Sequence, residues 1–176
     1  IVAIILSYSR AGIISLATIS TIFLYQRLIH RRMLRFFLLA GLVTLILGCY
    51  WMKKDSADGR LLIWQSCINM VKVSPWMGHG LGSFEAHYMD YQAEYFRIYG
   101  QQNRYAMLAD NVKHPFNEYM GILLNFGTIG LLILCAFILL LIYCYKRNST
   151  IEKKIALYTL ISIGIFSLFS YPFTYP

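Results

Sequence analysis

The chain has 176 residues, of which 58% are hydrophobic and only 14% are charged. A water-soluble domain of this length does not use so large an apolar share, so the composition excludes one and indicates an integral membrane protein. The net charge of +8 gathers mainly in two short connections between apolar stretches, a pattern that reports membrane orientation and excludes a nucleic-acid partner as its explanation.

Four apolar stretches are predicted to cross the membrane: 1–25, 36–52, 119–145 and 155–171. A hydrocarbon core needs roughly 20 residues of helix. Because a backbone in lipid must satisfy its own hydrogen bonds, each stretch is expected to be helical. We therefore expect an all-α, polytopic membrane helix bundle. The first residue already lies in an apolar run, so further spans are expected on its N-terminal side.

The distribution of charge predicts the orientation. The connections between spans one and two and between spans three and four are rich in arginine and lysine, whereas 53–118 has nearly balanced charges. Basic connections stay in the cytoplasm. The chain is thus expected to divide into two transmembrane helices (1–52), a large, mainly helical loop on the opposite side of the membrane (53–118), which in a bacterium is the periplasm, and two further transmembrane helices (119–176).

Two helices are expected within this loop. Residues 59–73 mix apolar and polar side chains like an amphipathic helix on the membrane surface, with Ser56 or Asp58 as its cap. Ser83 is expected to cap a second helix over 84–99, which ends at the following glycine. Its tyrosines recur at helical spacing, which favours packing against the membrane or the bundle over sugar stacking.

The rest of the loop carries weaker signals. Glycines alternate at Gly78, Gly80 and Gly82, but they follow no strand and lack dinucleotide-binding spacing, so a plain turn is favoured over a phosphate loop. Residues 101–112 show the least pattern and are expected to be a loop. The scattered cysteines predict neither a disulfide framework nor a zinc site, and no carboxylate pair indicates a metal. No metal and no other cofactor are expected.

Two arginines are candidates for binding an anion. Arg10 lies within the first expected span, where a guanidinium costs about 2.5 to 3.5 kcal/mol and usually faces a bundle interior or a watery cavity. Snorkelling to the interface, or structural pairing with an acid, is the alternative. Arg60 follows Gly59 at the head of the surface helix, where backbone amides and a guanidinium can hold one anion together. Binding of a lipid headgroup explains Arg60 equally well.

His114 is the candidate general base. Pro115 disfavours helix at His114, which leaves the imidazole at the outer mouth of the bundle with Asn117 and Glu118 close behind. A histidine can accept a proton near neutral pH, and the cation of Lys113 favours its neutral form. A hydrogen bond from His114 to a lipid headgroup is the alternative.

Several short motifs follow one another along the chain: SYSRAG at 7–12, then Gly59, Arg60 and Trp64, then the alternating glycines with Phe84, then His114, Asn117, Glu118 and Tyr119, and finally Asn125, Phe126, Gly127, Gly130 and Leu131. In this order they resemble the O-antigen ligase family. That family includes lipopolysaccharide O-antigen ligases, O-antigen polymerases and protein O-oligosaccharyltransferases.

The resemblance implies an enzyme that takes a glycan from undecaprenyl pyrophosphate and passes it to a hydroxyl of the lipid A core, a growing glycan or a protein, without metal or nucleotide. His114 matches the family's histidine and is expected to be catalytic. Arg10 and Arg60 match its arginines and, with Asn117 and Glu118, are expected to bind substrate. The choice among the three activities stays open. A polysaccharide transporter or flippase and a membrane-anchored sensor are the rival classes.

Overall fold

The computed structural model describes residues 9–28, 31–100, 105–147 and 150–173. Those residues contain helices and no strand, which confirms the all-α prediction. The helices are α2 (Arg10–Arg27), α3 (Arg32–Met52), α4 (Lys54–Val73), α5 (Ser83–Tyr99), the short 3-10 helix η1 (Ala106–Leu108), α6 (Glu118–Arg147) and α7 (Ile151–Ser167).

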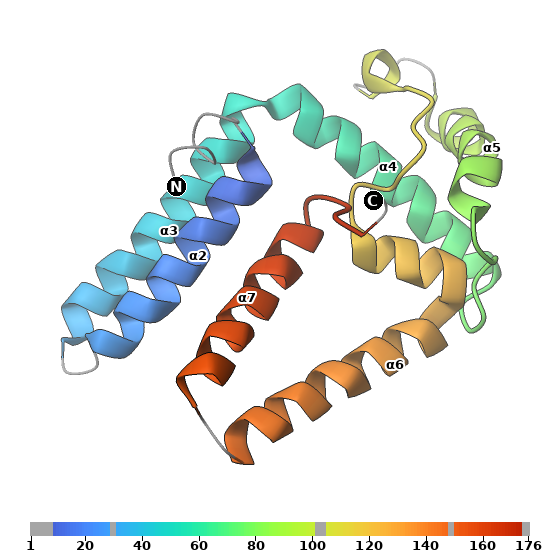
Figure 1. Ribbon diagram of the computed structural model, residues 1–176. Helices are drawn as coiled ribbons and strands as arrows, with labels where there is room; N and C mark the ends of the chain where they lie inside the picture. Colours follow the sequence, from blue (N-terminus) through green and yellow to red (C-terminus); the bar gives the residue numbers. More distant parts are fainter. Residues whose placement is uncertain (1–8, 29–30, 101–104, 148–149, 174–176) are drawn as a thin grey trace.

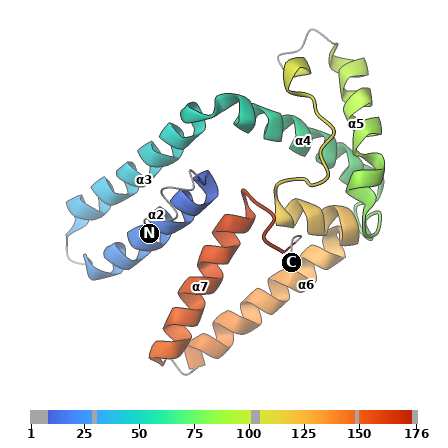
Figure 2. The same ribbon diagram turned by 45° about the horizontal axis from the view of Figure 1, so that its top comes forward.

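Helix α4 connects the two sides of the molecule. Helices α2 and α3 lie side by side as a hairpin, and α4 leads from the end of α3 across to α5 (Figure 1, Figure 2). Helix α7 contacts both α2 and α6. Its contact with α2 includes the Ser15 hydroxyl, which donates to the carbonyl of Ser162 at 3.0 Å. The residues that α4 carries are therefore placed between the α2–α3 hairpin and the α6–α7 pair.

Helices α3 and α6 are long and apolar enough to cross a membrane. Helices α2 and α7 form over the other two predicted spans, although residues 1–8 of the first lie outside the described residues. Helix α3 ends at Met52, as predicted. Helix α2 begins at Arg10 with Ser9 as its N-cap, so the expectation that Arg10 lies within a longer helix is wrong. Helix α7 ends at Ser167, so the predicted end at Tyr171 is wrong too.

The predicted cap of the surface helix is also wrong. Helix α4 begins at Lys54, so Ser56 and Asp58 lie inside it, and its N-cap makes no side-chain hydrogen bond. Both side chains have tertiary partners instead. The Ser56 hydroxyl accepts from Arg10 at 2.8 Å, and the Asp58 carboxylate accepts from the Tyr50 hydroxyl at 2.9 Å. These contacts come from α2 and α3, which the local sequence does not reveal.

Helix α5 differs from its prediction at one end only. It ends before Gly100, as expected, and Gly100 has a φ of 82°. Its N-cap is Gly82, with a φ of 78°, while Ser83 is the first helical residue. The Ser83 hydroxyl donates to the side chain of Asn125 at 3.3 Å. The expected capping hydroxyl is thus used to hold α5 against α6.

A small apolar core joins α4, α5 and the first half of α6. Its buried members are Ile63, Cys67, Met70, Phe84, Tyr88 and Leu124. Tyr88 is 1% exposed and stacks on Phe84, with ring centroids 4.8 Å apart, which confirms packing for this tyrosine. Burial raises the pKa of Tyr88 to about 12. This core gives the start of α6 a defined place beside α4.

Helix α6 is broken at Gly127, where φ is 64° and ψ is −163°. A break leaves backbone groups without helical partners, and the loop between α4 and α5 supplies them. The N–H of His79 donates to Leu124 O at 2.7 Å, the N–H of Gly80 to Asn125 O at 3.0 Å, and the N–H of Thr128 to Pro75 O at 2.8 Å.

These two segments of the chain can approach closely only because glycines meet there. A Cβ on Gly78 would lie 2.6 Å from the nitrogen of Gly127, and a Cβ on Gly127 would lie 2.2 Å from the oxygen of Trp76. We call the contact of residues 75–80 with residues 124–129 the glycine interlock. The predicted turn at the alternating glycines is confirmed, and its backbone fixes the bend of α6 seen in Figure 1.

Candidate functional site

Arg10 fastens the start of α2 to the corner between α3 and α4. Its Nη1 donates to the carbonyl of Lys53 at 3.1 Å, and its Nη2 donates to the Ser56 hydroxyl at 2.8 Å. Lys53 is both the C-cap of α3 and the N-cap of α4, and its carbonyl also accepts from the N–H of Ala57 at 3.1 Å. The guanidinium therefore has a defined position at the junction of three helices.

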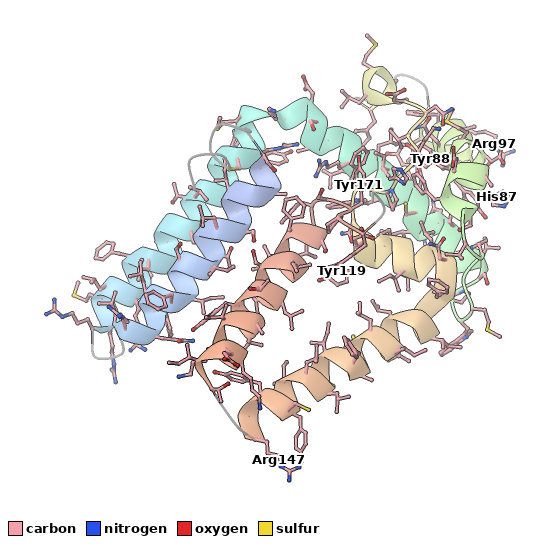
Figure 3. The ribbon with its side chains drawn as sticks, viewed as in Figure 1. His87, Tyr88, Arg97, Tyr119, Arg147 and Tyr171 are labelled. Carbon is pink, nitrogen blue, oxygen red and sulfur yellow. The ribbon has the colours of Figure 1, made fainter. Side chains whose placement is uncertain are left out.

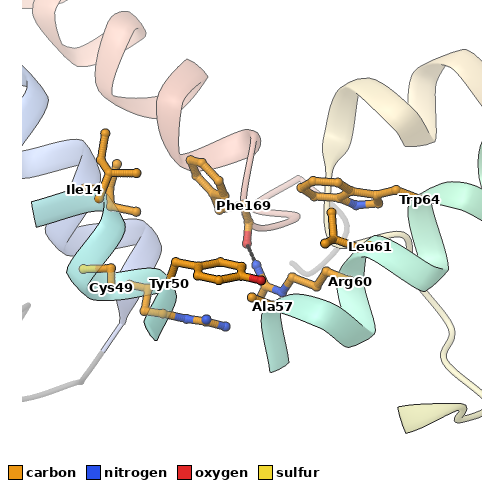
Figure 4. Close-up of a pocket in the computed structure, with 10 residues that line it drawn as sticks. Ile14, Cys49, Tyr50, Ala57, Arg60, Leu61, Trp64 and Phe169 are labelled. Atoms are coloured by element: carbon orange, nitrogen blue, oxygen red, sulfur yellow. Dashed lines mark hydrogen bonds between the residues drawn. The ribbon is translucent and has the colours of Figure 1, made fainter. Parts of the chain in front are cut away.

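Arg60 lies near the start of α4 and points toward the chain beyond α7. Its Nη1 donates to the carbonyl of Phe169 (Figure 4). Its guanidinium carbon lies 5.1 Å from the ring centroid of Phe116, within the range of a cation–π contact. Arg60 thus links α4 both to the segment after α7 and to the turn before α6.

Arg10 and Arg60 line one cavity of about 170 Å³. Figure 4 shows this cavity with Arg60 labelled on its wall. Its wall is otherwise mostly apolar: Ile14, Ile46, Cys49, Tyr50, Ala57, Leu61, Trp64 and Phe169. Among the described residues, the ion pairs are Arg97–Glu94 and Lys113–Glu85, so neither of the two guanidinium groups pairs with a carboxylate there. The cavity therefore combines two cations with an apolar surround.

The pKa of Arg60 reflects its burial in this cavity and the proximity of Arg10. Burial lowers the pKa of Arg60, the neighbouring charge of Arg10 lowers it further, and Tyr171 opposes both effects. Two cations close together repel each other, and a bound anion removes that repulsion. The cavity is consequently suited to a multiply charged anion such as a diphosphate.

His114 lies in the turn that leads into α6, and α4 holds this turn. Trp64 lies one helical turn after Arg60, and its Nε1 donates to the carbonyl of Pro115 at 2.9 Å. Phe116 has a φ of 53°, which is uncommon for a residue other than glycine and marks a strained turn. The same face of α4 therefore carries the second arginine and the anchor of the histidine turn.

His114 is not among the residues that line the cavity. It is connected to Arg60 by a succession of ring contacts. The ring centroids of His114 and Tyr171 are 4.9 Å apart, and those of Phe116 and Tyr171 are 5.2 Å apart. Phe116 in turn contacts the Arg60 guanidinium. The structure thus brings the three predicted residues Arg10, Arg60 and His114 into one region.

Asn117 and Glu118 have backbone partners. The Asn117 side-chain oxygen accepts from the N–H of Met120 at 3.1 Å, the geometry of a helix N-cap. The Glu118 carboxylate accepts from the N–H of Phe173 at 2.8 Å. Both side chains lie in the same short segment as His114, and their binding of substrate stays a prediction.

A second, more polar cleft of about 320 Å³ adjoins Arg60. Its lining consists of Asp55, Ser56, Gly59, Arg60, Ile63, Tyr88, Leu108, Asp110, Val112 and Phe116. Carboxylates of this kind accept hydrogen bonds from sugar hydroxyls, and protein hydroxyls both accept hydrogen bonds from them and donate to them. Arg60 lines both this cleft and the cavity shared with Arg10, so the two spaces adjoin at this residue.

The residues that follow α7 make site contacts that were not predicted from the sequence. Phe169 and Tyr171 were expected to be the last residues of a span, yet they contact Arg60 and His114. One signal was present: Pro172 disfavours helix at the residue before it, which indicates an earlier helix end. Their partners had no sequence signal because they lie far away along the chain.

A sequence model of a protein family, described as O-antigen ligase, matches residues 1–135. No curated protein and no solved structure matches the chain. The matched residues include Arg10, Arg60 and His114, and they contain every helix that lines the two cavities. With most of its length matched, the chain belongs to the O-antigen ligase family.

Proposed function

We propose that the chain forms part of a membrane glycosyltransferase that transfers a glycan from undecaprenyl pyrophosphate to an acceptor hydroxyl. Membership of the O-antigen ligase family supports the general activity. The observation that carries the proposal is the cavity that Arg10 and Arg60 share, with His114 close to Arg60. The acceptor is a hydroxyl of the lipid A core, a growing glycan or a protein.

The donor's pyrophosphate would lie between Arg10 and Arg60. Guanidinium groups bind phosphate oxygens with paired hydrogen bonds and keep their charge at any physiological pH. Ile14 and Ile46 on the same cavity wall suit the first units of a polyprenyl chain. The glycan would then extend past Arg60 into the polar cleft, where Asp55 and Asp110 can accept from its hydroxyls.

Transfer would occur in one displacement. The acceptor oxygen attacks the anomeric carbon while the bond from that carbon to the pyrophosphate oxygen breaks, and the electron pair leaves with undecaprenyl pyrophosphate. A nitrogen of the His114 imidazole takes the proton of the acceptor hydroxyl. Arg10 and Arg60 stabilise the charge that develops on the leaving oxygens. Because the displacement is single, the configuration at the anomeric carbon inverts.

Arg60→Ala is expected to lower kcat/KM for the lipid-linked donor by about 10- to 100-fold, the value of one charge-assisted hydrogen bond. Arg10→Lys is expected to lower kcat/KM as well. Lysine keeps the positive charge, but it cannot make both hydrogen bonds that the guanidinium donates to the Lys53 carbonyl and the Ser56 hydroxyl. The measurement is glycan transfer by the purified protein in detergent, where product formation without a gradient also excludes pure transport.

Arg97→Ala is the matched control for these variants. Arg97 lies on α5, its side chain is exposed, and its ion pair is with Glu94 on the same helix. The control should retain the transfer rate of the wild type. Normal transfer by Arg60→Ala would contradict the role proposed for the shared cavity. In cells that express Arg60→Ala in place of the wild type, the glycan should accumulate on its lipid carrier. In wild-type cells, the molecule to which the glycan is attached identifies the acceptor.

We further propose that the chain is a multi-pass protein of the bacterial inner membrane. In this arrangement 1–52 and 119–176 each contribute two spans, and 53–118 is the periplasmic loop. A cysteine introduced at Met107, which is 94% exposed, should then react with a membrane-impermeant maleimide in intact spheroplasts. A cysteine introduced at Ile151, which is 77% exposed, should react only after lysis.

The native cysteines allow this experiment with few changes. Cys49 and Cys67 are buried, and burial raises the pKa of the Cys67 thiol to about 12, so it does not ionise near neutral pH. Cys135 and Cys144 are exposed and would be replaced by serine in all variants. Equal labelling of both introduced cysteines in intact spheroplasts would contradict the proposed orientation.

A further inference from the structure

The segment after α7 touches three of the predicted site residues in succession. We call residues 168–173 the C-terminal strap. The carbonyl of Phe169 accepts from Arg60, the ring of Tyr171 packs on His114, and the N–H of Phe173 donates to Glu118 at 2.8 Å. The strap lies outside the residues matched by the family model. Its contacts are therefore an observation that family membership does not supply.

Tyr171 makes the second of these three contacts, and its side chain is labelled in Figure 3. Its ring is 4.9 Å from that of His114 at an interplanar angle of 32°, and 5.2 Å from that of Phe116 at 65°. Phe116 lies under the Arg60 guanidinium. Tyr171 is also among the groups that act electrostatically on Arg60. The tyrosine therefore connects the candidate base with the candidate diphosphate-binding arginine.

We propose that Tyr171 is a positioning residue of the transferase, which holds the His114 imidazole in the orientation that accepts the acceptor's proton. The inference rests on the proposed function. An imidazole on a loop turns about two side-chain torsions, and a flat ring packed against one face limits that rotation. Orientation of a catalytic group matters because a misplacement of about 1 Å costs on the order of 100-fold in rate.

Tyr171→Ala is expected to reduce kcat by about 10- to 100-fold and to change KM for the lipid-linked donor by less than about twofold. Tyr171→Phe keeps the packed ring and should transfer within about threefold of the wild type. Tyr171→Leu keeps apolar volume without a flat ring and should resemble Tyr171→Ala. Tyr143→Ala is the control. Tyr143 is an exposed aromatic residue near the C-terminal end of α6, and this variant should have the kcat and KM of the wild type.

Introducing Tyr171→Ala into the His114→Ala variant distinguishes a positioning role of Tyr171 from a general loss of stability. If Tyr171 acts through His114, Tyr171→Ala should change the residual rate of His114→Ala by less than about twofold. An equal drop in both backgrounds, a wild-type rate for Tyr171→Ala or Tyr171→Leu, or a low rate for Tyr171→Phe would overturn the inference. Failure of the proposed function is a distinct result, because His114→Ala would then transfer glycan normally or the wild type would form no product.

Discussion

Replacing His114 by alanine is expected to reduce glycan transfer by about 100- to 10,000-fold, the usual contribution of a general base. In the proposed mechanism the acceptor hydroxyl loses its proton as it attacks the anomeric carbon, and alanine would leave no group at position 114 to take that proton. The half-buried ring of His114 packs on Tyr171, and the backbone of its turn is held by Trp64, so the fold should survive the substitution. The measurement is kcat of the purified protein, together with its elution profile in detergent.

His87→Ala is the control for this prediction. His87 is an exposed histidine of α5 and points away from the site (Figure 3). It should retain the wild-type rate. His114→Asn adds a test of proton transfer, because asparagine can form hydrogen bonds but does not accept a proton near neutral pH. A rate close to that of the wild type for His114→Asn would rule out His114 as the base.

Among the substitutions proposed for this protein, Gly127→Ala is expected to cause the largest loss of folding stability. The backbone at Gly127 lies in a region that is essentially restricted to glycine and costs other residues about 1 to 3 kcal/mol. The added Cβ would also lie 2.2 Å from the oxygen of Trp76, and overpacking of this kind typically costs a further 1 to 3 kcal/mol or so. The loss should appear as a lower melting temperature in detergent and a lower yield from membranes.

Gly80→Ala is the matched control for the glycine interlock. Gly80 also has a positive φ, of 89°, but a Cβ there would meet nothing within 4 Å. It should therefore lose only the strain of its backbone conformation. The difference between the two variants measures the steric part of the interlock. Equal melting temperatures for Gly127→Ala and Gly80→Ala would show that the close approach of residues 75–80 to residues 124–129 is not what fixes the bend in α6.

The interlock also bears on activity. The first half of α6 follows the turn that carries His114, and the interlock and the small apolar core together hold this half beside α4. Loss of the bend would move His114 relative to Arg60. Any Gly127→Ala protein that still folds should therefore transfer glycan more slowly, whereas Gly80→Ala should retain its rate.

Much of the helical structure was predictable from local pattern. Apolar runs and the residues that end helices gave the end of α3 at Met52 and the end of α5 before Gly100. The caps of α4 and α5 were not predictable in this way. Ser56 and Ser83 have the chemistry of caps, but Arg10 and Asn125 use their hydroxyls instead. A hydroxyl bonds whichever partner the fold brings near, and here those partners lie more than forty residues away along the chain.

The site shows the same division between local and distant information. Family-like motifs in the sequence were sufficient to nominate Arg10, Arg60 and His114, because residue type and order along the chain carry that information. Their meeting in one region depends on packing. The contact between Arg60 and Phe169 spans 109 residues, and the break of α6 at Gly127, which was predicted to lie within one continuous span, depends on hydrogen bonds from the distant residues 75–80. Hydrophobic periodicity reports which residues leave water, but only the packed helices decide which distant groups then become neighbours.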